Sequence, residues 1–98
     1  MNTYVILSDL DDSTPSIIRS LADQKKDFNL ILLSDSIFLL NDLPDTFFKH
    51  LKNRGINIYA IREDVKKRNP QNENILDLID YETLVDLLLE GQVKVINL

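Results

Sequence analysis

Carboxylate side chains follow each of four apolar runs in this sequence, and such an arrangement could support metal or phosphate chemistry. They are Asp9, Asp11 and Asp12, then Asp35, then Glu63 and Asp64, and finally Asp80. If the runs are parallel strands, their carboxyl ends share one edge of a sheet, where such sheets bind ligands. Carboxylate oxygens bind Mg²⁺, and Mg²⁺ bridges phosphate groups. A magnesium-dependent phosphotransfer site that uses Asp9 and Asp11 is therefore one hypothesis.

The apolar runs are the elements that must position these carboxylates. We expect strands at residues 4–7, 30–33, 56–61, 75–79 and 93–96. The runs are continuously apolar rather than alternating, which is typical of strands that are buried on both faces of a parallel sheet. Segments with helical spacing separate them, and right-handed crossovers place such helices on both faces. The predicted fold is a three-layer α/β/α sandwich with a mainly parallel sheet of about five strands, formed by residues 1–98 as a single domain.

Capping residues predict where the helices begin and end. Thr14 is expected to cap a helix with Pro15 at its first position. Residues 37–40 form a candidate short helix that Pro44 interrupts. The next helix should begin at Asp45 or Thr46 and end at Gly55. The last helix is expected to begin after a cap at Asp80, to run to Glu90 and to stop at Gly91.

The segment YVILSDLDDSTP resembles the first motif of the haloacid-dehalogenase phosphatases, in which one aspartate is phosphorylated and the next handles the proton. Response-regulator receivers use similar acidic residues. Both require a cation near a later strand end to neutralise phosphoryl oxygens, and Arg62, which is followed by Glu63, is the only candidate. Asp12 also stands where the phosphatase motif commonly has glycine, and 98 residues are short for such an enzyme. We therefore expect Asp9 and Asp11 to be turn and cap residues.

Three longer segments resemble, in order and spacing, the TusB/DsrH family of sulfur-relay subunits. They are LILLSDSIFLLN, LKNRGINIYAIREDVKKRN and ILDLIDYETLVDLL. The residues that match the family motifs are Asp35, then Asp64, Val65 and Arg68, then Asp80 and Tyr81. All of these except Val65 are candidates for a subunit interface. Residues 2–28 match only in their pattern of strand, loop and helix. Ser36 and Asn69 stand where the family commonly has glycine, so loop shape could differ at these two turns.

The resemblance implies a non-catalytic subunit of a complex similar to TusBCD or DsrEFH. Such a chain packs against related DsrE/DsrF-like or TusC/TusD-like subunits, and a cysteine of a partner carries the persulfide. These relays serve either tRNA wobble-uridine 2-thiolation or sulfur oxidation, and no cofactor is implied. This sequence has no cysteine, and therefore no thiolate that could accept a persulfide. A stand-alone homo-oligomer with an unknown ligand is a third hypothesis.

Composition and charge limit the other function classes. The formal net charge of −5 disfavours nucleic-acid binding. The basic residues around His50 and at 66–68 are expected to complement helix C-termini. No run approaches the roughly 20 apolar residues of a membrane span, and no signal peptide is recognisable, so we expect a cytoplasmic protein without membrane contact.

Large apolar and paired polar residues leave two interpretations open. The chain has more large apolar residues than one helix face can bury, namely Leu39, Leu40, Phe47, Phe48 and residues 87–89. This excess favours either an oligomer contact or a two-sided core. Asp64 and Arg68 have the i,i+4 spacing of a simple helical ion pair. The hydroxyl of Tyr81 could lie at a subunit contact, or its ring could pack on the protein's own core.

Overall fold

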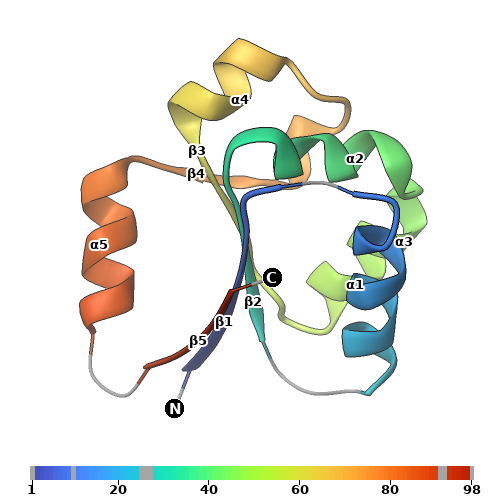
Figure 1. Cartoon of the computed structure of the whole chain (residues 1–98), viewed down its shortest axis with the longest axis horizontal. Helices are drawn as coiled ribbons and strands as arrows, with labels where there is room; N and C mark the ends of the chain where they lie inside the picture. Colours follow the sequence, from blue (N-terminus) through green and yellow to red (C-terminus); the bar gives the residue numbers. More distant parts are fainter. Residues whose placement is uncertain (1, 10, 25–27, 91–92, 98) are drawn as a thin grey trace.

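A five-stranded, wholly parallel sheet forms the centre of the computed structural model, which describes residues 2–9, 11–24, 28–90 and 93–97 (Figure 1). The strands are β1 (Asn2–Leu7), β2 (Asn29–Leu32), β3 (Ile58–Ile61), β4 (Asp77–Ile79) and β5 (Val93–Asn97). Their spatial order is β4-β3-β2-β1-β5, and every neighbouring pair is parallel. The predicted sheet is therefore confirmed.

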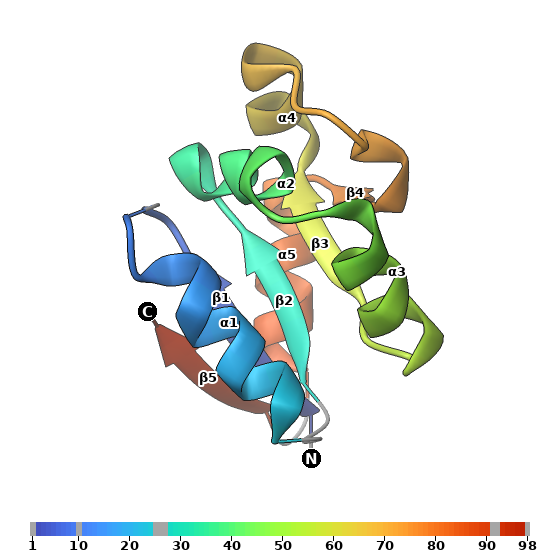
Figure 2. The ribbon, with the colours of Figure 1, turned by 90° about the vertical axis from the view of Figure 1, so that its right-hand side faces the viewer.

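Helices cover both faces of this sheet, which confirms the three-layer arrangement. The helices are α1 (Thr14–Asp23), α2 (Leu39–Asp42), α3 (Asp45–Asn53), α4 (Arg62–Arg68) and α5 (Tyr81–Leu89), with short 3-10 helices η1 (Ser34–Phe38) and η2 (Glu73–Ile75). Helices α1, α2 and α3 lie on one side of the sheet, and α5 lies on the other (Figure 1). Helix α4 lies beyond the carboxyl end of β3 (Figure 2).

The two faces of the sheet have separate cores. The larger core contains residues from alternate positions of the central strands, such as Leu30 and Leu32, packed with Ile18 and Phe48 from the helices. The smaller core lies on the α5 side and has four buried residues, Tyr4, Ile31, Ile61 and Leu84. Because side chains alternate between faces along a strand, Ile31 points away from its neighbours Leu30 and Leu32.

Most of the large apolar residues fill this two-sided core. Leu39, Leu40 and Phe48 are fully buried, and Phe47 packs against the larger core while remaining partly exposed. Residues 87 and 88 are half-buried on the α5 side. Of these large apolar residues, only Leu89, which is 78% exposed, is still a candidate for an oligomer contact.

Several predicted boundaries are confirmed and others are wrong. Helix α1 begins at Thr14 itself, with Ser13 at the N-cap, so the predicted cap at Thr14 is wrong and Pro15 is the second helical residue. The strand predicted at 75–79 is shortened to β4 because η2 precedes it. Helix α3 ends before Gly55, which has a φ of 84°. Helix α5 ends at Leu89, and the expected stop at Gly91 lies outside the described residues.

The two positions at which the family commonly has glycine behave differently. Asn69 adopts the left-handed conformation, with a φ of 44°, at the end of α4. Asparagine tolerates this region better than most residues. Ser36 does not have a positive φ; the positive φ of that turn falls on Ser34, at 52°. Ser36 is instead buried, with its hydroxyl 2.7 Å from the carbonyl oxygens of Leu7 and Leu33.

Candidate functional site

Helix α4 lies at the carboxyl edge of the sheet and separates two groups of polar side chains. Its residues Asp64 and Arg68, one turn apart, face the η1 turn. Its residues Arg62 and Lys66, also one turn apart, line a hollow beside the start of α5. Residues that are four positions apart share one side of a helix, so α4 presents each pair to a different neighbour.

The first group, here called the α4 clasp, consists of Ser34, Asp35, Asp64 and Arg68. The backbone N–H of Ser34 donates a 3.1 Å hydrogen bond to Oδ2 of Asp64. Nε of Arg68 lies 3.2 Å from Oδ1 of Asp35, and its Nη1 lies 3.7 Å from Oδ1 of Asp64. The α4 clasp thus joins the turn after β2 to the helix after β3, and it unites three of the five predicted interface residues.

Burial distinguishes the two acids of the α4 clasp. The Asp64 side chain is only 13% exposed, whereas that of Asp35 is 69% exposed. A buried carboxylate requires partners, and Asp64 has both a backbone donor and a guanidinium. The exposed pair of Asp35 with Arg68 contributes at most about 1 kcal/mol. Asp64 therefore does more than form the surface ion pair with Arg68 that the i,i+4 spacing predicted, because it also accepts a hydrogen bond from the Ser34 N–H.

The second group lines a small hollow between α4 and α5, here called the α4–α5 hollow. Its lining residues are Ile61, Arg62, Glu63, Lys66, Asp80 and Tyr81. Its volume is about 140 Å³, well below the roughly 300–1,000 Å³ of typical small-molecule sites. Such a hollow suits a single side chain of another protein better than a cofactor.

Asp80 is the N-cap of α5, as predicted. Its Oδ1 accepts a 2.8 Å hydrogen bond from the backbone N–H of Thr83, which satisfies one of the free donors of the first helical turn. The backbone and side chain of Thr83 together hold the pKa of Asp80 below its ordinary value of 3.8. Asp80 therefore has a structural role that needs no ligand.

Asp9 and Asp11 line a separate small hollow, with Leu7, Thr14 and Ile17. Oδ1 of Asp11 accepts hydrogen bonds from the backbone N–H and the hydroxyl of Ser13, at 2.9 and 2.6 Å. It also accepts them from the N–H and hydroxyl of Thr14, at 3.1 and 3.2 Å. The Ser13 hydroxyl, then these other donors, keep the pKa of Asp11 below 3.8. Asp11 is a cap residue, as expected.

The structure does not assemble the components of a phosphotransfer site. Arg62, the expected phosphate cation, lines the α4–α5 hollow, whereas Asp9 and Asp11 line a different one. Within residues 2–9, 11–24, 28–90 and 93–97, no group of three or more acidic or histidine side chains is placed to hold a metal ion. The geometry therefore favours the structural interpretation of Asp9 and Asp11.

The outer surface of α5 carries exposed apolar side chains, here called the α5 stripe, which consists of Tyr81, Val85 and Leu89. Tyr81 is 56% exposed and Val85 is 51% exposed. The ring of Tyr81 therefore does not pack fully into the protein's own core, the alternative considered from sequence. The sequence interpretation missed Val85, although its spacing of four residues from both Tyr81 and Leu89 places it on the same side of the helix.

A family model described as DsrH like protein matches residues 8–94. The chain belongs to the DsrH-like family. The resemblance recognised from the C-terminal motifs is thereby confirmed, and it extends into the N-terminal part that matched only in pattern. The α4 clasp and the α4–α5 hollow both lie within the matched region.

A solved structure with a similar fold is that of a conserved protein of unknown function from Bacteroides thetaiotaomicron. The two share 17% sequence identity with a TM-score of 0.68, over 99% of this chain and 95% of that chain. At this identity the likeness establishes the fold alone. The search of curated proteins found no match. Across the described residues, no helix is long and apolar enough to cross a membrane.

Proposed function

We propose that this chain is a non-catalytic subunit of a sulfur-relay complex similar to TusBCD or DsrEFH. The observation that carries the proposal is the match of the DsrH-like family model to residues 8–94. Membership of this family supports a sulfur-relay role in general. The particular complex, its partners and its pathway are proposals that extend from it.

The absence of cysteine assigns the sulfur chemistry to a partner. Persulfide transfer requires a nucleophilic thiolate, and none of the 98 residues can supply one. We infer that this chain holds and positions a cysteine-bearing subunit and does not itself form a covalent intermediate. The relay serves either tRNA wobble-uridine 2-thiolation or sulfur oxidation, in the cytoplasm, with the chain acting as one domain.

The family-motif residues have defined structural tasks in this proposal. The α4 clasp keeps the turn after β2 and helix α4 in a fixed arrangement at the carboxyl edge of the sheet. Asp80 fixes the start of α5, and Tyr81 presents an exposed ring beside it. We propose that partner subunits, related to DsrE and DsrF or to TusC and TusD, contact the protein near these residues.

The test is a gentle purification of the tagged chain from its own host, followed by native mass spectrometry. We expect stoichiometric partners of similar size that bear cysteine. When the purified complex is supplied with a cysteine persulfide donor, a partner cysteine should gain the mass of one sulfur atom while this chain remains unmodified. An untagged chain purified in parallel controls for nonspecific retention.

Two results would contradict the proposal. If only copies of this chain are recovered under conditions that preserve other complexes, the relay role is wrong. If partners are recovered but no cysteine among them accepts sulfur, the complex has another task.

A further inference from the structure

The α5 side of the sheet remains partly uncovered by the protein's own elements. Leu89 of the α5 stripe is 78% exposed, and Val95 on β5 is 43% exposed. Val95 is in register with Tyr4, which belongs to the core on the α5 side, so both side chains point to that face. Ile6, two residues beyond Tyr4 on the same face, is also only partly buried. The α5 stripe thus continues across β1 and β5.

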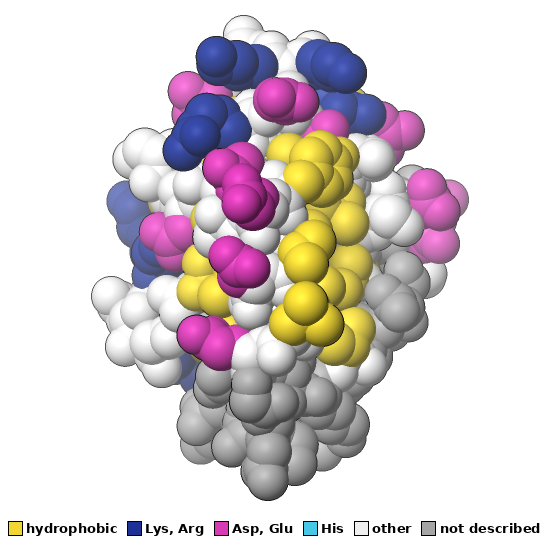
Figure 3. All heavy atoms as spheres, turned by 90° about the vertical axis from the view of Figure 1, so that its left-hand side faces the viewer, with side chains coloured by type: hydrophobic (Ala, Val, Ile, Leu, Met, Phe, Trp, Pro, Cys, Tyr) yellow, Lys and Arg dark blue, Asp and Glu magenta, His cyan; other side chains and the backbone are white. Residues whose placement is uncertain are grey.

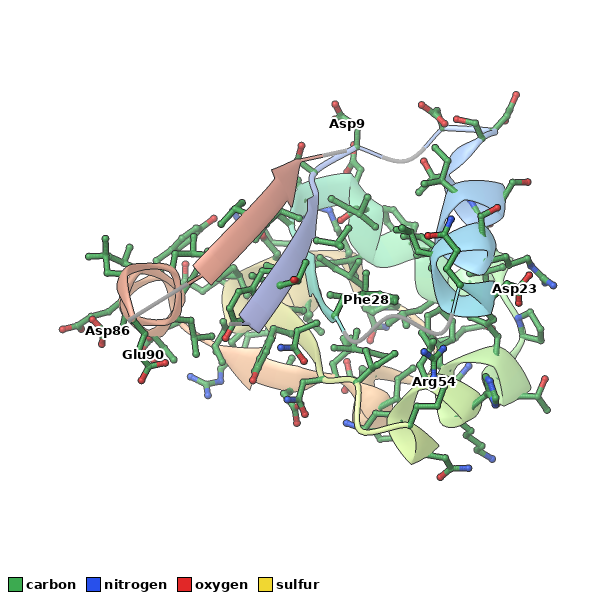
Figure 4. All side chains as sticks on the ribbon, turned by 90° about the horizontal axis from the view of Figure 1, so that it is seen from below. Asp9, Asp23, Phe28, Arg54, Asp86 and Glu90 are labelled. Atoms are coloured by element: carbon green, nitrogen blue, oxygen red, sulfur yellow. The ribbon has the colours of Figure 1, made fainter. Side chains whose placement is uncertain are left out.

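This apolar surface forms a continuous stripe with acidic side chains along one side (Figure 3). The exposed acids of α5 and its end are Glu82, Asp86 and Glu90, which follow one another at helical spacing. Asp86 points from α5 away from the sheet (Figure 4), whereas Glu90 is near enough to Tyr4 and Tyr59 that, in addition to burial, its charge raises the pKa of both phenols. Residues 81–90 contain no lysine, arginine or histidine. The border that α5 itself supplies is therefore negative, whereas Arg62 and Lys66 of α4 lie near the Tyr81 end of the stripe.

The acidic side chains beside the α5 stripe indicate what kind of protein can bind to it. Like charges brought together across an interface cost free energy, whereas opposite charges at the rim favour association. A second copy bound through antiparallel α5 helices about a two-fold axis would align the two acidic rows on the same side of the contact. A different chain with lysine or arginine around an apolar patch would neutralise them. Tyr81 also borders the α4–α5 hollow, which offers space for one inserted side chain.

We propose that the α5 stripe, with Ile6 and Val95, binds a different protein chain whose contact surface is apolar and bordered by lysine or arginine. This inference rests on the proposed function, because it names the surface through which a relay partner is held. The stripe supplies the area removed from water, and the acidic border supplies orientation and partner choice.

The test uses the DsrE-like and DsrF-like chains encoded in the same genome, each co-expressed with this chain. The variants Val85→Arg and Leu89→Arg place a cation within the stripe at exposed positions, so we expect the fold to be kept and binding to weaken at least tenfold. Ile17→Arg is the matched control, because Ile17 on α1 is a 39% exposed apolar residue on the opposite side of the sheet. Circular dichroism verifies folding of each variant.

Charge reversal tests the acidic border. The double variant Glu82→Lys and Asp86→Lys should weaken the complex, and the difference from the unaltered chain should diminish at high salt because screening removes the long-range attraction. Binding is measured by biolayer interferometry at low and high salt, and the isolated chain is examined by sedimentation velocity.

Each other outcome overturns a defined part of the inference. A complex that survives Val85→Arg and Leu89→Arg shows that partners bind elsewhere and leaves the relay proposal intact. Self-association of the isolated chain that Val85→Arg abolishes assigns the stripe to a second copy. If the folded, unaltered chain binds none of the related chains, the proposed function fails and this inference fails with it.

Discussion

The two faces of the sheet differ in how completely the chain covers them. On one face, α1, α2 and α3 close a large core in which residues such as Phe48 and Leu51 have no exposed surface. On the other face, among the residues that the structure describes, α5 is the one covering helix, and it buries a single side chain of its own, Leu84. The difference separates positions that maintain the fold from positions that remain free for a partner. It also predicts that equivalent substitutions will have very different consequences on the two faces.

The largest effect is expected at the covered face. Phe48→Ala should lower the free energy of unfolding by about 3–5 kcal/mol, because it removes buried apolar surface and leaves a cavity. Equilibrium unfolding in urea measures the loss. The control Leu89→Ala, on the exposed side of α5, should change stability by no more than about 0.5 kcal/mol. Similar losses for both variants would refute the contrast between the faces.

A smaller effect is expected at the carboxyl edge that α4 covers. Asp64→Ala should cost about 1–3 kcal/mol, because the Ser34 N–H and the Arg68 guanidinium lose a buried acceptor. Thermal unfolding measures the loss of stability, and hydrogen exchange measures the loss of protection at the Ser34 amide. Asp35→Ala is the control and should cost at most about 1 kcal/mol, because Asp35 is exposed. Equal costs would mean that burial does not distinguish the two acids of the α4 clasp.

A pH-dependent effect is expected at the start of α5. The folded pKa of Asp80 is lowered, so below pH 3.8 the unfolded chain binds the proton more readily than the folded one. The contribution of Asp80 is therefore complete above pH 3.8 and is lost as pH falls through the folded pKa. Asp80→Asn keeps a capping oxygen but does not titrate. Urea unfolding on both sides of pH 3.8 should show the stability advantage of the unaltered chain shrinking as pH falls; an advantage independent of pH would contradict this account.

The smallest effect on stability is expected at the α5 stripe itself. Val85→Thr preserves side-chain shape at a half-exposed position and should change the free energy of unfolding by no more than about 0.5 kcal/mol. Leu84→Ala, one residue away but buried, should cost about 2–5 kcal/mol. Urea unfolding of both variants measures the difference. A substantial loss for Val85→Thr would show that the stripe belongs to the protein's own core.

Sequence reasoning succeeded where local patterns correspond to local structure. Continuous apolar runs identified the strands, and Asp80 and Gly55 were placed correctly at the start of α5 and after the end of α3. It failed at Thr14, because the cap of α1 is completed by Asp11 from the preceding turn. It also overextended the fourth strand, since Ile75 has the apolar character of a strand but lies in η2.

The candidate site was only partly predictable. Asp35, Asp64 and Arg68 were selected from family motifs, but nothing in the sequence indicated that the buried Asp64 would receive the N–H of Ser34. Serine is an uncommon choice for a positive φ, so the turn at Ser34 carries no recognisable signal. The exposed side of α5 was predicted only in part, since Tyr81 and Leu89 were candidate contact residues but Val85 was not. Helical spacing defines a side of α5 but not which side the sheet covers.

The sequence by itself determined the parallel α/β architecture, the family and the absence of a thiol, because apolar periodicity, motif order and residue identity are properties of the chain alone. The tertiary structure decided which carboxylates meet and which apolar residues remain exposed. Those outcomes depend on strand order and crossover side, which place residues such as Ser34 and Asp64, 30 positions apart, within hydrogen-bond distance. The same strand order and crossovers place α5 as the one helix that covers its side of the sheet in the described part of the chain.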